Sequence, residues 1–209
     1  MSDRARQVLD YWFGPAAIGT EDALNARMGF WFGGQASPEV IAMRDQQIEL
    51  RFGDLVRQAM AGELAQWAAS PRRRLALIIL LDQFPRSIHR GKAEAFAGDE
   101  AALRLTLEGM QLGADAALTA PERLFFYMPL QHAESLEIHD ESLAAFRRLV
   151  AEAPMALKPV FVDVLNYADL HRSIVARFGR FPHRNAALGR PSSDEELRYL
   201  ADSAPRFGQ

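Results

Sequence analysis

Helix start and stop signals constrain the fold of this chain most, because nothing in the sequence supports strands in place of helices. No stretch alternates apolar and polar residues with period two, and no Asn-Gly or Asp-Gly dipeptide indicates a hairpin turn. Residues that can cap a helix start, followed by proline or acidic residues, stand at Ser37, Ser70, Thr119 and Ser193. Glycines that favour a helix end stand at Gly14, Gly33, Gly53, Gly113 and Gly179. The sequence therefore predicts an all-α fold.

Between these signals, the apolar spacing predicts about eight to ten helices. The expected ranges, among which neighbours can merge, are 3–13, 21–32, 38–52, 54–68, 71–84, 99–112, 120–128, 130–151, 157–178 and 194–201. The connections between them are short, which favours antiparallel neighbours stacked as helical hairpins. No segment is rich enough in Pro, Gly and Ser to be a linker, so we expect a single helical domain over residues 1–209.

Charge and composition argue against several classes of protein. The chain has 209 residues, a net charge of −3 and a pI near 6.0, which argues against binding to duplex nucleic acid or to membranes. It has no cysteine, which excludes disulfides, thiolate metal sites and cysteine nucleophiles. The N-terminus lacks an apolar signal core, and the longest apolar run, residues 75–81, is too short to span a bilayer. We therefore expect a cytoplasmic protein.

The end of that apolar run carries a carboxylate where one is disfavoured. Asp82 follows the run directly, in the last turn of the expected helix, where the helix dipole disfavours an anion. Because the run is apolar on every side, we expect Asp82 to be buried, and a buried carboxylate needs a partner. Asp82, Gln83 and Arg86 could form the wall of a pocket. The preferred interpretation is a buried Asp–Arg pair that ties the helix end to the next turn.

Three histidines are expected to face the interior. His132 and His139 lie on one helical stripe with apolar residues, at successive spacings of 4, 3, 4 and 3. His171 lies on the apolar face of a later helix. With nearby acidic residues these histidines could form a zinc or di-metal site, but no His-Glu-x-x-His or Glu-x-x-His spacing is present. We therefore expect hydrogen-bonded core histidines, and predict no metal site and no cofactor.

The segment 177–190 combines arginines with aromatic residues. It contains four arginines and one histidine and no acidic residue, with Arg180, His183, Arg184 and Asn185 at its centre. A guanidinium binds phosphate or carboxylate through two hydrogen bonds, and the aromatic rings could stack on a ligand ring. Equally, the segment could be a C-terminal clasp, with phenylalanines in the core and arginines paired to surface acids. The segment is too short to suggest binding to duplex DNA.

A proline interrupts a helical pattern at Pro129. It frees carbonyl groups one turn earlier, so either a kink or the start of a new helix is expected there. Tyr127 and His132 flank this break. They could line a pocket, and they could equally pack in the core.

Taken together, these stretches resemble a bacterial family known as domain of unknown function 924. The matching stretches extend over nearly the whole chain and are residues 8–14, 31–32, 70–86, 127–134, 177–190 and 193–197. The run Arg-Phe-Gly-Arg-Phe-Pro-His-Arg-Asn is the most specific of them. The chain departs from the family pattern at Arg73, where glycine is more usual, and at Ala133, where serine is more usual. The resemblance implies a helical, tetratricopeptide-like fold and implies no activity.

Two functions and a purely structural role fit these residues. The first is a binding or scaffold module whose Arg- and His-rich pocket takes an anionic small molecule or an acidic peptide. The second is a hydrolase-like enzyme, in which a histidine acts as acid or base and an arginine anchors an anionic substrate. No nucleophile elbow, P-loop or dinucleotide motif supports the enzyme, so we prefer the binding module.

The sequence identifies no catalytic set and does not define an oligomeric state, but it does provide candidate ligand-binding residues. These are Asp82, Gln83, Arg86, Tyr127, His132, His171, Arg180, His183, Arg184 and Asn185. An enzyme predicts that such residues converge on a pocket that solvent can reach. A scaffold predicts that they pair with one another in the core, while an open apolar groove lies elsewhere. Convergence without solvent access favours the purely structural role.

Overall fold

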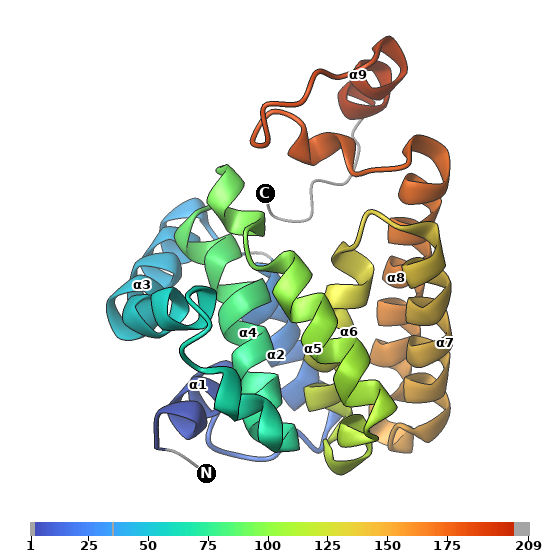
Figure 1. Cartoon of the computed structure of the whole chain (residues 1–209). Coiled ribbons are helices and arrows are strands. Elements are labelled where there is room, and N and C mark those ends of the chain that lie inside the picture. Colours follow the sequence, from blue (N-terminus) through green and yellow to red (C-terminus); the bar gives the residue numbers. More distant parts are fainter. Residues whose placement is uncertain (1–2, 35, 203–209) are drawn as a thin grey trace.

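The computed structural model describes residues 3–34 and 36–202, and Figure 1 shows the course of the chain. Within these ranges the chain forms nine α-helices, five short 3-10 helices and no strand. The α-helices are α1 (Asp3–Phe13), α2 (Glu21–Phe32), α3 (Pro38–Met60), α4 (Pro71–Ile88), α5 (Asp99–Gln111), α6 (Ala120–His132), α7 (Leu136–Glu152), α8 (Lys158–Phe178) and α9 (Asp194–Ala201). The 3-10 helices are η1 (Ala65–Ala69), η2 (Ala93–Phe96), η3 (Ala114–Ala117), η4 (Met155–Leu157) and η5 (Pro182–Arg184). The predicted all-α fold is confirmed.

The helix α4 lies at the centre of the fold and packs against α1, α3, α5 and α6. All of its residues from Arg74 to Pro85 are buried, as the apolar run predicts. Apolar area removed from water stabilises a fold by about 25 cal/mol per Å², so a helix buried on all sides contributes strongly to the core. None of the described helices is both long enough and apolar enough to cross a membrane.

Aromatic side chains attach α1 and α2 to this core. Trp12 and Trp31 both pack against Phe125 of α6, with ring centroids 5.3 Å and 4.6 Å from it. The indole Nε1 of Trp31 donates a hydrogen bond of 2.8 Å to the carbonyl of Trp12. Phe84 of α4 lies 5.5 Å from Trp12. Because large rings bury much apolar area, these contacts fix the N-terminal helices to α4 and α6.

Helices that follow one another in the chain pack side by side from α3 to α8. Only residues 153–157 join α7 to α8, so these two helices run antiparallel, and Figure 1 shows them side by side. This arrangement agrees with the predicted stack of helical hairpins. The first two helices do not continue the stack, because α1 packs against α4 and α2 packs against α8. The tetratricopeptide-like detail stays a prediction.

Two predicted helix boundaries are wrong, namely the helix end at Gly53 and the helix start after Pro129. The helix α3 continues through Gly53, and α6 continues through Pro129. Inside a helix, glycine costs about 1 kcal/mol and proline about 3 kcal/mol relative to alanine. Burial outweighs these costs here, because Gly53 is buried and so is every residue from Leu124 to His132. The chain leaves the helix instead at Ala133, which adopts an extended backbone.

The C-terminal segment (residues 179–202) lies over one end of the helical body. Gly179 ends α8 in a left-handed conformation, with φ of 69°, which redirects the chain. Figure 1 shows the segment above the region where α4 ends and α5 begins. Ile174, Val175 and Phe181 form a small apolar cluster that is separate from the main core. Ile174 and Val175 belong to α8, so the segment is attached to the body by the apolar side chain of Phe181 as well as by polar contacts.

Candidate functional site

Five charged or titratable side chains meet where α4 ends, α5 begins and α6 ends. They are Asp82, Arg86, Asp99, His132 and Arg184, and we refer to them as the charged cluster. Asp82 and Arg86 lie in the last turns of α4, and Asp99 is the first residue of α5. His132 is the last residue of α6, and Arg184 is the last residue of η5. Elements that are distant in the sequence thus place polar side chains at one point.

Asp82 is fully buried near the end of α4. One of its carboxylate oxygens lies 2.6 Å from Nδ1 of His132, and the other accepts a hydrogen bond from the amide of Gln83. Burial raises the pKa of this carboxyl, but His132 and Arg86 lower the pKa by more, so that it lies below the ordinary value. Asp82 is therefore an ionised and fully partnered carboxylate.

His132 ends α6 and is 9% exposed. Because Asp82 is ionised, Nδ1 of His132 carries the proton of their hydrogen bond, and Nε2 keeps a lone pair. Nε2 has no hydrogen-bond partner among the residues that the structure describes. Burial and then Arg86 lower the pKa of His132, against the opposing effect of the carboxylates. The side chain is therefore a neutral imidazole with an unused acceptor.

Arg86 and Asp99 form a two-point ion pair. Nη1 and Nη2 of Arg86 donate to the two carboxylate oxygens of Asp99, at 2.7 Å and 2.9 Å. Nη1 also lies 3.3 Å from the carboxylate of Asp82, so the predicted buried Asp–Arg pair is present. The pair does not tie a helix end to the next turn, because α4 continues through Pro85 to Ile88 and contains both residues. Burial lowers the pKa of Arg86, but the two carboxylates raise it by more. Asp99 also stands in the first turn of α5, where the helix dipole favours an anion.

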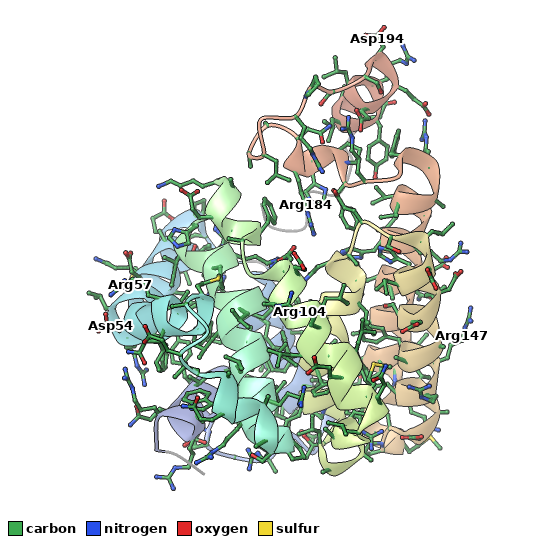
Figure 2. All side chains as sticks on the ribbon, in the orientation of Figure 1. Asp54, Arg57, Arg104, Arg147, Arg184 and Asp194 are labelled. Atoms are coloured by element: carbon green, nitrogen blue, oxygen red, sulfur yellow. The ribbon has the colours of Figure 1, made fainter. Side chains whose placement is uncertain are left out.

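Arg184 points from the C-terminal segment toward the helical body (Figure 2). Its Nη1 donates to Asp99 at 3.2 Å and to the carbonyl of His132 at 3.1 Å. The guanidinium carbon lies 4.7 Å and 4.5 Å from the ring centroids of Phe96 and Phe181. Nε is buried and has no partner within the described part of the chain. Burial lowers the pKa of Arg184 to about 10, so the side chain is charged at neutral pH.

Three further histidines surround Phe181. The rings of His139, His171 and His183 lie 5.9 Å, 5.8 Å and 5.5 Å from it, and His171 also lies 6.4 Å from His132. Nε2 of His139 and Nδ1 of His171 donate to backbone carbonyls at 2.9 Å and 2.7 Å, so the expected core histidines are present. Burial lowers the pKa of His139 to about 4, and the pKa values of His171 and His183 to about 3. In the described ranges, no group of three or more His, Asp or Glu residues could hold a metal ion.

Arg180 and Asn185 contact the C-terminal segment itself and do not reach the charged cluster. Arg180 forms a two-point ion pair with Glu196 of α9, at 2.7 Å and 2.8 Å. The buried Asn185 donates to Ser192 at 3.0 Å and accepts from Arg190 at 3.1 Å. These two residues fit the clasp interpretation of the segment, because their contacts hold its turns together.

Glu134 provides a second polar link between the segment and the body. It lies between α6 and α7, and it accepts a hydrogen bond of 2.8 Å from the backbone N–H of Phe181. Its carboxylate also pairs with Arg190 at 2.6 Å and 2.9 Å. Burial raises the pKa of Glu134, but Arg190, the backbone N–H of Phe181 and Arg184 together lower the pKa by more, so the side chain is ionised. The segment is therefore attached to the body by Arg190 as well as by Arg184.

Tyr127 lies apart from the other candidate residues. Its hydroxyl donates to Asp115 of η3 at 2.5 Å, and burial raises its pKa. Its ring packs against Phe146 of α7 at 5.9 Å. Because α6 is continuous through this region, Tyr127 and His132 are five residues apart on one helix and lie on different faces.

Sequence reasoning did not assign Asp99, Phe96 or Glu134 to the site. Asp99 stands at the start of a helix, where acidic residues are common for local electrostatic reasons, so its position indicates nothing further. Phe96 is one of 13 phenylalanines in the chain. One signal was available, because the segment 177–190 has four arginines and no acid and therefore requires carboxylate partners from elsewhere.

A surface hollow lies elsewhere, at the start of α4. It has a volume of about 480 Å³ and is lined by Ser70, Pro71, Arg72, Arg73 and Ala117. None of the candidate ligand-binding residues lines it. The charged cluster is thus a separate and largely buried site.

The match to known proteins extends over the whole charged cluster. A family described as bacterial protein of unknown function (DUF924) matches residues 8–204. The chain belongs to the DUF924 family. The DUF924 chain is also similar to the solved structure of ATU0120, a protein of unknown function from Agrobacterium tumefaciens, with 34% identity and a TM-score of 0.68. That similarity covers 87% of this chain and 99% of the other.

No curated protein matches the sequence. Membership of the DUF924 family confirms the resemblance that the motifs predict. It assigns no activity, since the family and the solved relative are both described as having unknown function.

Proposed function

We propose that the protein binds a small anion, through a carboxylate or phosphate group, at the charged cluster. The observation that supports this most directly is Nε of Arg184, a buried donor without a partner among the described residues. A buried donor left unpaired costs about 1–3 kcal/mol. An anion placed against Nε removes this cost and forms a charge-assisted hydrogen bond.

The guanidinium of Arg184 has a two-donor edge and a fixed orientation, both of which suit such a ligand. Asp99 and the carbonyl of His132 both bond to Nη1, which leaves the edge formed by Nε and Nη2. That edge presents two parallel N–H groups, whose spacing matches two oxygens of a carboxylate or phosphate. Contacts with the rings of Phe96 and Phe181 hold the guanidinium plane, so little side-chain freedom is lost on binding.

Charge and burial favour a small anion over a peptide. Arg86 and Arg184 share the carboxylate of Asp99, and their mutual repulsion contributes to the lowered pKa of Arg184, after the larger effect of burial. An anion near both cations offsets that repulsion. Because Arg184 is only 6% exposed, a small molecule suits this position better than a peptide chain.

Isothermal titration calorimetry with sulfate and with acetate tests the proposal. We expect the wild type to bind at least one of these anions and to melt at a higher temperature in its presence. Arg184→Lys keeps the charge but removes the two-donor edge, so we expect its affinity to fall by about tenfold or more.

Arg177→Lys is the matched control for this experiment. Arg177 belongs to the same segment of the sequence, but it pairs with Glu195 at 2.9 Å on the exposed surface. We expect this variant to keep the affinity of the wild type. Failure of the wild type to bind either anion, or equal affinity in Arg184→Lys, would contradict the proposal.

A further inference from the structure

The charged cluster as described carries no net charge. Asp82 and Asp99 are carboxylates, Arg86 and Arg184 are guanidiniums, and His132 is a neutral imidazole. Each cation already pairs with a carboxylate, so an added anion meets no surplus of positive charge. A buried ion without compensating charge is costly. A further positive charge at the site therefore strengthens the binding of an anion.

His132 is the group best placed to supply that charge. Its Nε2 has no hydrogen-bond partner among the described residues, and the side chain remains 9% exposed, which gives a proton a route to Nε2. Its Nδ1 lies 2.6 Å from Asp82. A carboxylate in that position orients the ring and stabilises the imidazolium once it forms.

The other titratable groups around His132 come from every neighbouring element. They are Asp82 and Arg86 of α4, Asp99 of α5, Glu134 before α7, His139 of α7, His171 of α8, and His183 and Arg184 of the C-terminal segment. The arginines are already charged, and each of the carboxylates is paired with an arginine. Burial keeps the pKa values of the other three histidines at about 3 to 4, and Asp82 is bonded to His132 and to none of those three.

We infer that the anion binds together with one proton, which Nε2 of His132 takes from solvent. The inference rests on the proposed anion binding and specifies how that site is regulated. No bond in the ligand breaks, since one anion and one proton add to the neutral cluster. Affinity for the anion consequently rises as the pH falls, by up to about tenfold per pH unit while the free imidazole is neutral.

The test is calorimetry with sulfate and acetate between about pH 6.5 and 8, a range in which neither anion titrates. Titrations in two buffers with different enthalpies of protonation give the number of protons taken up. We expect an uptake of about 0.5 to 1 proton per bound anion near pH 7. In parallel, the Cε1–H resonance of His132 in the wild type, assigned by its loss in His132→Gln, should move toward the imidazolium position when anion is added.

One variant at His132 and one control variant at His89 complete this experiment. His132→Gln should bind anion more weakly than the wild type and with almost no proton uptake, because glutamine does not titrate. His89→Gln is the control, since His89 lies at the C-terminal end of α4 outside the charged cluster. We expect it to retain the full uptake.

The outcomes separate the two proposals. Binding without proton uptake, together with an unchanged His132 resonance, would overturn the inference and leave anion binding intact. Failure of the wild type to bind either anion at any pH would overturn both. If His132→Gln does not fold, the proton uptake of the wild type, measured in the two buffers, decides the question without it.

Discussion

Arg184 contacts three separate parts of the chain, which are Asp99 at the start of α5, the carbonyl of His132 at the end of α6, and the ring of Phe96 in η2. Arginine suits this position because its planar cation stacks on rings while its edges donate several hydrogen bonds. Arg180, four residues earlier in the same motif, pairs instead with Glu196. Two arginines with similar sequence surroundings thus have different roles, which depend on which side of the segment each occupies.

Asp82→Asn should lower the free energy of unfolding by about 3 kcal/mol or more, because it removes one charge from a buried ionic network. The variant leaves Arg86 with a single carboxylate and removes the anion bonded to His132. Chemical denaturation in urea gives this quantity directly.

Asp54→Asn is the control for that measurement. Asp54 also pairs with an arginine, Arg57, but both side chains are 73% exposed. Exposed pairs contribute about 0–1 kcal/mol, so we expect little change in the unfolding free energy. Equal losses in the two variants would show that the charged cluster adds no more to stability than a surface pair.

Among the helices, α5 approaches its neighbours closely because glycines stand where side chains would collide. A Cβ atom on Gly98 would lie 2.1 Å from the carbonyl oxygen of Leu81 in α4. A Cβ atom on Gly109 would lie 2.5 Å from the ring of Phe126 in α6. The first of these contacts also positions Asp99, the next residue after Gly98, against the end of α4. Close packing of elements and assembly of the site therefore depend on the same glycine.

Gly98→Ala should destabilise the protein by about 1–3 kcal/mol, since the added methyl group meets backbone that cannot rotate away. We also expect weaker binding of sulfate or acetate, because Asp99 is displaced from Arg86. The melting temperature and the calorimetric affinity measure the two effects separately.

Gly29→Ala serves as the comparison. Gly29 lies within α2, and a Cβ atom there would meet nothing within 4 Å. Alanine favours a helix over glycine by about 1 kcal/mol, so this variant should melt at the same or a higher temperature. Similar behaviour of both variants would mean that α5 relaxes around the methyl group at no cost.

The boundaries of helices could be predicted where local signals act without competition. The capping boxes at Thr119 and Ser193 and the helix end at Gly179 are all present. The predicted helix end at Gly53 and the predicted helix start after Pro129 were wrong because both residues occupy buried positions. A local preference of about 1–3 kcal/mol is smaller than the free energy gained when the apolar side chains around such a position are buried. The sequence pattern does not show how much apolar area is buried there.

At the scale of the whole molecule, only part of the candidate site could be predicted. Asp82 was recognisable because a carboxylate follows an apolar run, and Arg184 because its segment lacks acids. Their convergence depends on contacts between distant parts of the chain, which no helical periodicity encodes. Asp99 could not be predicted, since a helix start accounts for an acidic residue without any tertiary partner.

Acid should destabilise the molecule through its buried histidines. Burial lowers the pKa of His139 to about 4, and those of His171 and His183 to about 3, from 6.5. Below pH 6.5 the unfolded chain therefore binds more protons than the folded one, and stability falls with falling pH until these folded pKa values are reached. The slope is up to about 1.4 kcal/mol per pH unit for each histidine.

Melting temperatures measured between about pH 7.5 and 4.5 test this expectation. His139→Gln can still donate to a backbone carbonyl, but it does not titrate. In this variant the melting temperature should fall less steeply with pH, by the contribution of one histidine. Glu196 adds to the loss of stability only at lower pH, because Arg180 lowers the pKa of Glu196 from 4.5 to about 2. A melting temperature that stays constant from pH 7.5 down to 5 would contradict the assignment of neutral buried histidines.

The residues of the charged cluster come from distant parts of the chain, and this separation determines when the cluster can form during folding. Helices that pack on their neighbours in the chain close short loops, whereas the contact between Asp99 and Arg184 joins residues 85 positions apart. During synthesis, α1 to α7 are complete before Arg184 has been added to the chain. The helical body can therefore collapse first, and the cluster is completed only when the last part of the chain folds back onto it. A polypeptide that ended before residue 184 would retain most of its helices and lack its proposed binding site.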